Sequence, residues 1–86
     1  MKLKKSFICQ ELGQTRFLVS MDPENFRGFM RGNETTGFIL DRLSQEISRE
    51  DLIRAIAEEY DAPEDVIARD TDSILDKLRS MNALEE

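Results

Sequence analysis

Few side chains in this sequence could act as a nucleophile, a general base or a metal ligand, and they are poorly grouped. Histidine is absent, which removes histidine-dependent triads, the commonest general base and most zinc sites. The single cysteine, Cys9, stands in an alternating, strand-like segment without a histidine partner. We therefore interpret Cys9 as a small buried hydrophobe rather than a nucleophile, and it has no second cysteine for an internal disulfide.

The acidic residues include two short clusters that could suggest a calcium site, Glu58-Glu59-Asp61 and Glu64-Asp65. Neither cluster has the loop spacing and central glycine of an EF-hand, so a solvated helix face is the better interpretation. The sequence also has no phosphate-binding glycine loop. It therefore predicts a protein that is not an enzyme, without catalytic residues, metal ligands or a cofactor.

The length and composition predict one small globular domain spanning residues 1–86. Apolar residues make up 40% of the chain and charged residues 35%, in runs too short to cross a membrane. The basic start at Met1–Lys5 is not followed by the apolar segment of roughly 7–15 residues that a signal peptide needs. We expect a cytoplasmic protein.

The net charge of −6 is unevenly distributed along the chain. Residues 1–33 carry six basic and three acidic side chains, hence +3, whereas residues 34–86 carry six basic and fifteen acidic ones, hence −9. A phosphate backbone would repel most of this acidic second part.

The first third of the chain alternates between apolar and polar residues, as strands do. In residues 7–12, Phe7 and Cys9 share one face, and in residues 15–20, Phe17 and Val19 share a face opposite Arg16 and Ser20. Turn residues separate these two strands from a third at 26–31. The pattern predicts a three-stranded antiparallel meander.

The remaining residues predict three helices, so the expected class is α+β, in the order βββααα. Asn33 is a good N-cap for a helix over 34–43, and Ser48 for a second that runs to about Tyr60. Pro63 suits the first position of a third helix that ends near Asn82. The expected inner faces are Thr36, Ile39, Leu40 and Leu43, then Leu52, Ile53, Ile56, Ala57 and Tyr60, then Val66, Ile67, Ile74, Leu75, Leu78 and Met81.

The segment from Asn33 to Leu43 resembles the "N-E-T-G-x-x-I" opening of the first helix in PqqD-like proteins. The resemblance continues through Glu59-Tyr60-Asp61, Pro63-Glu64-Asp65-Val66 and Asp70, and it covers about residues 7–84. The family usually has Leu where this chain has Gly32, and often Gly where it has Gln45. Gly32 removes an apolar anchor at the end of the third strand.

The resemblance implies a winged-helix-like fold and a role as a non-catalytic recognition element for ribosomally made peptides. Such a domain binds the leader segment of a precursor peptide and presents the remainder to a modifying enzyme, often a radical S-adenosylmethionine enzyme. The leader is expected to add as a strand beside the third strand, in a groove closed by the third helix. The expected partners are the precursor peptide and that enzyme, and the domain itself is a monomer or a homodimer.

The third strand is a credible place for peptide addition, because an edge strand offers unpaired backbone donors and acceptors. Arg27 and Arg31 would lie on one face, with Phe26 and Met30 on the other. Gly28 leaves room for close backbone approach. The candidate peptide-binding residues of this strand are Phe26, Arg27, Gly28, Phe29, Met30 and Arg31. A plain third strand with solvated arginines remains the alternative.

The third helix has two neighbouring apolar rows. Thr71, Leu75 and Leu78 form one row, which we expect to face the core. Ile67, Ile74 and Met81 form the other, which we propose lines the groove, with Asp70 beside it to meet a basic leader side chain. A core position for both rows stays open. The hypothesis predicts that Asp at Met30 or Ile74 abolishes peptide binding and leaves the fold intact.

A winged-helix DNA-binding protein is the main alternative function. Recognition helices usually gather Lys and Arg to contact phosphates and bases. Here the second helix has four acids against two arginines, and the third has five acids against three basic residues. These charges disfavour nucleic acid as a partner.

Overall fold

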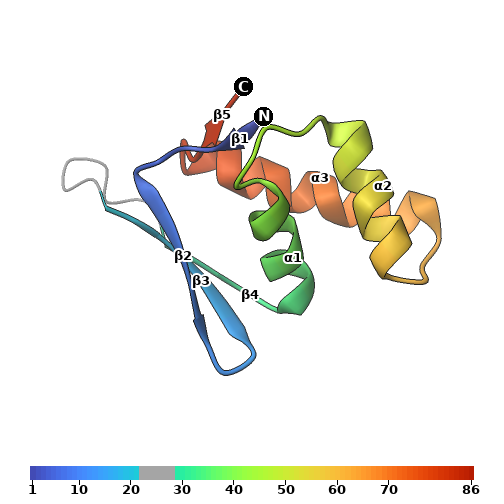
Figure 1. The fold of residues 1–86 in the computed structure, drawn as a ribbon, viewed down its shortest axis with the longest axis horizontal. Helices are drawn as coiled ribbons and strands as arrows, with labels where there is room; N and C mark the ends of the chain where they lie inside the picture. The colour runs from blue at the N-terminus through green and yellow to red at the C-terminus, as the bar shows by residue number, and fades with distance from the viewer. Residues whose placement is uncertain (22–28) are drawn as a thin grey trace.

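A three-stranded antiparallel sheet lies beside three helices, and the first of these helices contacts the sheet (Figure 1). The computed structural model describes residues 1–21 and 29–86. The predicted order βββααα is confirmed, and a pair of two-residue strands at the chain ends adds to it. The elements are β1 (Lys2–Leu3), β2 (Phe7–Leu12), β3 (Thr15–Ser20), β4 (Phe29–Gly32), α1 (Glu34–Arg42), α2 (Arg49–Glu59), α3 (Glu64–Ser80) and β5 (Leu84–Glu85).

The sheet has the order β2-β3-β4, so β3 is central and β4 lies at one edge. The register pairs Cys9 with Leu18 and Leu18 with Met30, which places these three side chains in one row. Leu18 is fully buried and Ser20 is buried, so the face opposite Phe17 and Val19 packs against the helices. The helices all lie on this side of the sheet (Figure 1).

Side-chain caps set the starts of the first two helices, as predicted. The Asn33 carboxamide oxygen accepts a hydrogen bond from the backbone N–H of Thr36 at 3.1 Å. The Ser48 hydroxyl accepts one from the backbone N–H of Asp51, also at 3.1 Å. Pro63 is the N-cap of α3 rather than its first residue, and its missing N–H costs nothing there.

The core lies where the three helices meet the inner face of the sheet. Its fully buried large side chains come from β3, all three helices and the α1 C-cap: Leu18, Ile39, Leu40, Leu43, Leu52, Leu75, Leu78 and Thr71. The predicted inner face of α2 is wrong at one position, because Ala57 is exposed. Among the described residues, none of the helices combines the length and the apolar character that a membrane crossing needs.

The two chain ends pair with each other, which the sequence did not predict. Lys2 pairs with Glu85 and Leu3 with Leu84 in the antiparallel strands β1 and β5. The chain reaches β5 through Asn82, whose φ of 58° supplies a left-handed turn just after α3. Two-residue strands have no periodicity to detect, and this pairing depends on the packing of the whole chain.

An ion pair joins α2 to α3. The Arg49 Nε donates to Asp72 Oδ1 at 2.7 Å, and Nη2 donates to Oδ2 at 2.9 Å. The hydrogen bond from Arg49 lowers the pKa of the Asp72 carboxyl. Because the pKa of Asp72 is lower in the folded protein than in the unfolded chain, the ion pair stabilises the fold at pH values above the ordinary carboxyl pKa. This stabilisation is lost as the pH falls through the lowered pKa of the folded state.

We therefore expect Asp72→Asn to lower the thermal unfolding midpoint slightly near neutral pH. The difference from wild type should fade as the pH drops below the ordinary carboxyl pKa of about 3.9. The effect is small and sensitive to salt, because both side chains are partly exposed. Thermal melts of both proteins across pH and ionic strength measure this. A difference that persists unchanged in acid would contradict the assignment.

Candidate functional site

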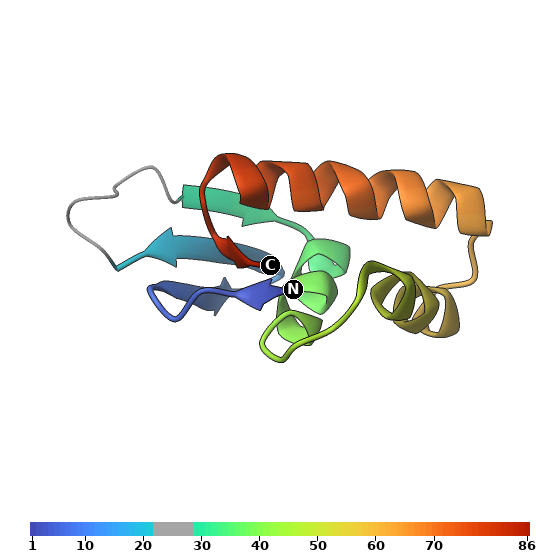
Figure 2. The same ribbon diagram turned by 90° about the horizontal axis from the view of Figure 1, so that it is seen from above.

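The strand β4 presents an open edge beside α3. It pairs with β3 on one side, and no other strand among residues 1–21 and 29–86 pairs with its second edge. Seen from above, α3 lies on the β4 side of the sheet and not on the side of the opposite edge strand β2 (Figure 2). The open edge of β4 is therefore the one that faces a helix.

The junction between β4 and α1 is fixed by the side chain that follows the strand. Asn33 caps α1 and also accepts a hydrogen bond from the Thr36 hydroxyl at 3.2 Å. Gly32, the last residue of β4, pairs with Arg16. A Cβ at Gly32 would collide with the side chain of Thr36. Glycine is therefore required at the end of β4 because Thr36 occupies the space beside it.

A groove cavity of about 240 Å³ lies between the start of α1 and the middle of α3. On the α1 side it is lined by Asn33, Thr35 and Thr36, and on the α3 side by Asp70, Ser73 and Ile74. The α3 residues follow helical spacing, so they share one face of the helix. The cavity lies at the end of β4, where a strand added to the open edge would arrive.

A second pocket of about 240 Å³ adjoins the groove cavity, because Thr35 and Asp70 line both. We call it the three-helix pocket, since residues of α1, α2 and α3 surround it. Ile39, Ile56 and Ile67 give it an apolar interior. We call these two neighbouring hollows together the recess.

The predicted site residues divide into three groups. Phe26, Arg27 and Gly28 lie outside the described residues, so the third strand as described covers Phe29–Gly32 rather than 26–31. Phe29 begins β4 and pairs with Val19, and Arg31 is exposed on the strand. Asp70 and Ile74 line the groove cavity together.

The other predicted site residues are more buried than a groove lining requires. Met30 is only 9% exposed and belongs to the core, as do Ile67 and Met81. Ile67 also lines the three-helix pocket. The first row of α3, Thr71, Leu75 and Leu78, is fully buried as expected. The second row is half-buried at Ile74 and buried at its two ends.

Sequence reasoning missed the residues that α1 contributes to the recess. Asn33, Thr35 and Thr36 were interpreted as the start of a helix, although the same turn forms one wall of the groove cavity. Ser73 was also missed, although it follows Asp70 by three residues and therefore shares its face of α3. The signal available in the sequence was the direct connection of the third strand to a capped helix, with no loop between them.

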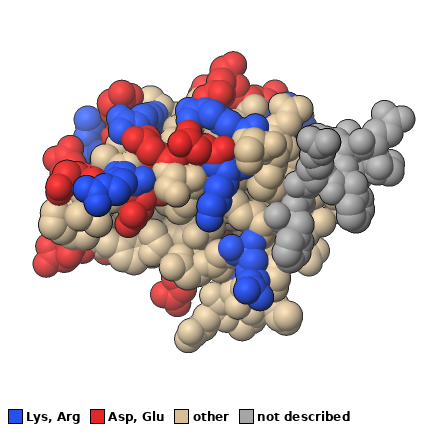
Figure 3. Space-filling model, turned by 180° about the vertical axis from the view of Figure 1, so that it is seen from behind, with Lys and Arg blue, Asp and Glu red and all other residues tan. Residues whose placement is uncertain are grey.

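The charges around this face are mixed. Acidic and basic side chains are interspersed over the helical part of the surface, and uncharged residues with a few basic ones lie toward the strands (Figure 3). Asp70 is exposed and lines the recess, whereas Arg31 is exposed on the other face of the sheet, level with Phe17. A bound peptide could therefore be recognised by charge as well as by apolar contact.

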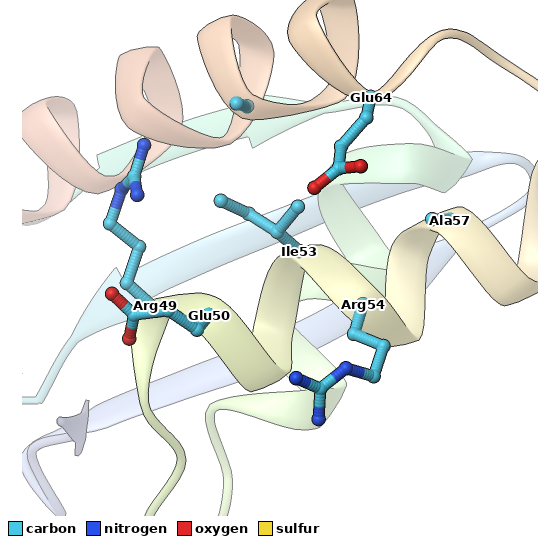
Figure 4. Close-up of a pocket in the computed structure, with 7 residues that line it drawn as sticks. Arg49, Glu50, Ile53, Arg54, Ala57 and Glu64 are labelled. Atoms are coloured by element: carbon cyan, nitrogen blue, oxygen red, sulfur yellow. The ribbon is translucent and has the colours of Figure 1, made fainter.

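A larger hollow of about 430 Å³ lies between α2 and α3, away from β4 (Figure 4). Ile53 and Glu64 point into it, whereas Arg54 points away. Arg49 also lines it, and its guanidinium is already held by Asp72. Among the described residues, no group of three Cys, Asp or Glu side chains could hold a metal ion. This hollow is lined by residues of α2 and α3, several of them charged, and by no residue of β4.

Comparison with known proteins assigns the chain to a family. The sequence profile of the family described as Coenzyme PQQ synthesis protein D (PqqD) matches residues 18–84. The chain belongs to the PqqD family. The match begins within β3, so it covers β4, all three helices and the start of β5, and leaves β2 outside. The PqqD resemblance seen in the helical motifs is thereby confirmed.

The fold of this PqqD family member is also found in a solved structure. The structure of TbiB1 in complex with the TbiA(beta) leader peptide superimposes with a TM-score of 0.80 and 19% sequence identity. The alignment covers 99% of this chain and 95% of that one. A search of the curated proteins finds no match to the sequence. At this identity the structural likeness establishes the shared fold of three strands and three helices.

Proposed function

We propose that this PqqD family member is a non-catalytic adaptor that binds the leader segment of a ribosomally synthesised precursor peptide and presents it to a modifying enzyme. The observation that carries the proposal is the open edge of β4 beside the groove cavity of α1 and α3. Family membership and the fold shared with TbiB1, a protein solved with a leader peptide, support it.

The leader peptide binds as an added strand along β4. An edge strand supplies backbone hydrogen bonds to any extended peptide, and pockets for alternate side chains then select the sequence. Here Ile74 offers an apolar contact on the α3 side, and Asp70 offers a carboxylate to a basic side chain. Arg31 attracts an acidic residue elsewhere in the peptide. The preferred leader is therefore an extended segment with an apolar residue near charged ones.

The adaptor acts by raising the local concentration of the peptide at an enzyme, because one protein holds both partners. A radical S-adenosylmethionine enzyme is the proposed type. We place this encounter in the cytoplasm, with the adaptor itself needing no cofactor. No described observation favours DNA binding, since both α2 and α3 carry more acidic than basic side chains.

The test is a titration of isotope-labelled protein with the leader segment of a short precursor peptide encoded beside its gene. Saturable changes in the amide shifts of residues 29–32 and of α3 are expected. A parallel titration with random duplex DNA should leave the spectrum unchanged. Shifts with DNA and none with the leader would overturn the adaptor role in favour of the winged-helix alternative.

A further inference from the structure

The outer face of the sheet, which is turned away from the helices, carries more apolar residues than its solvent exposure explains. Solvated faces of antiparallel sheets usually have polar residues at the outward positions. None of the described helices lies on this side of the strands (Figure 1). The register and the alternation of side chains nevertheless place mostly apolar residues there. The apolar outward residues include Ile8, Leu12, Phe17, Val19 and Met21, and the polar ones are Gln10, Thr15 and Arg31.

Three of these apolar side chains are exposed and belong to one patch. Leu12 is 74% exposed, Met21 62% and Ile8 40%. Ile8 pairs directly with Val19, and Met21 follows Val19 by two residues on the same face. Leu12 pairs with Thr15 and is therefore diagonal to Phe17, which connects it to Val19. Exposed apolar residues that adjoin one another in this way mark an interaction surface, whereas singly scattered ones do not.

The charge of the outer face indicates what kind of surface fits it. Among the outward positions of β2, β3 and β4 as described, Arg31 is the only charged residue. An occupant that combines an apolar centre with carboxylates therefore complements this face. A second copy packed face to face about a two-fold axis would bring the two arginines together without an acidic outward residue to pair with them.

We propose that the outer face of the sheet docks the modifying enzyme, through an apolar surface of that enzyme which also carries acidic side chains. The inference rests on the proposed function and deepens it, because it gives the second partner a surface of its own. The leader is proposed to bind at the open edge of β4 and in the groove cavity between α1 and α3, on the helical side of the sheet. The adaptor can therefore hold both partners at once, which raising their local concentration requires.

The test measures the affinity of this protein for the radical S-adenosylmethionine enzyme encoded beside its gene, by calorimetric titration. Leu12→Asp and Met21→Asp each place a charge in the exposed apolar patch. Val66→Asp is the matched control, because Val66 is an apolar side chain that is 38% exposed on α3. Gln10→Glu and Gln10→Lys change the charge at an exposed outward position of β2. Thermal melts establish that each variant folds, as expected for substitutions at exposed positions.

We expect Leu12→Asp and Met21→Asp each to raise the Kd for the enzyme about 10-fold or more, because each removes a buried apolar contact. Val66→Asp should leave this Kd within about threefold of wild type. Gln10→Glu should bind the enzyme about 2- to 10-fold more weakly than Gln10→Lys, because it repels the carboxylates of the partner. Leader affinity should be unchanged in Leu12→Asp and Met21→Asp.

An enzyme that binds wild type, Leu12→Asp and Met21→Asp equally overturns the outer face as its docking site, and intact leader binding then leaves the adaptor role standing. Equal affinity of Gln10→Glu and Gln10→Lys overturns the acidic character of the enzyme surface. Sedimentation of the free protein tests the other occupant, because a wild-type dimer that Leu12→Asp dissociates assigns the face to a second copy. A wild-type protein that binds neither leader nor enzyme overturns both the docking site and the adaptor role.

Discussion

Replacing Ile74 with Asp should raise the Kd for the leader peptide by about 10- to 150-fold, because burial of one aliphatic side chain is worth roughly 1.5–3 kcal/mol. Ile74 lines the groove cavity and is half-buried, so its outer part is free to contact a peptide. A carboxylate there would be desolvated by the incoming strand without a cation beside it. Calorimetric titration of the variant and wild type measures the change.

The matched control is Ile8→Asp, the same substitution at an isoleucine that is 40% exposed on β2, the opposite edge strand. It should leave peptide affinity within about threefold of wild type, because a substitution far from the groove cavity acts independently of the contacts made there. Equal loss in both variants would indicate a general effect on folding. Met30→Asp is unsuitable, contrary to the expectation from sequence, because Met30 belongs to the core and the substitution should unfold the protein.

The stability of the junction between β4 and α1 should depend on Gly32, because only glycine leaves room for the side chain of Thr36. Gly32→Ala is expected to lower the free energy of unfolding by roughly 1–3 kcal/mol, because the new methyl group meets Thr36. Aligned on Asn33 and Ile39, the "N-E-T-G-x-x-I" motif has glycine where this chain has Thr36, and the family usually has Leu where this chain has Gly32.

In this chain the contact is made by Gly32 and the larger Thr36. Thr36→Gly alone should destabilise the protein by about 1 kcal/mol, from glycine in a helix and the lost hydroxyl contact with Asn33. The double variant Gly32→Ala/Thr36→Gly should be more stable than the sum of the two single changes predicts, by roughly 1–2 kcal/mol. Urea denaturation of the wild type, the two single variants and the double variant gives the four free energies of this double-mutant cycle. Strict additivity would mean that the two residues do not share the space.

Local patterns predicted the secondary structure because the first two helices begin at recognisable caps. Asn33 and Ser48 both accept the expected backbone hydrogen bonds, and the buried residues of α1 follow the predicted stripe. The choice of sheet face was harder. Phe17 and Val19 are the conspicuous apolar pair of β3, yet Leu18 is the residue that is fully buried. Alternation defines two faces, but the packing of the helices decides which one is covered.

The candidate site was only partly visible in the sequence, because it is a product of packing. The spacing of Asp70 and Ile74 put them on one face of α3, and both line the groove cavity. Nothing in the sequence showed that the first turn of α1 forms the facing wall. The three-helix pocket likewise exists only once three separate helices are in place.

The most direct test of the adaptor role is to measure nuclear Overhauser contacts between the backbone protons of a bound leader peptide and those of the protein. We predict a ladder of cross-strand contacts to residues 29–32, with further contacts from peptide side chains to Ile74. Contacts confined to β2 or to the α2–α3 hollow would contradict strand addition at β4, even if the peptide binds tightly.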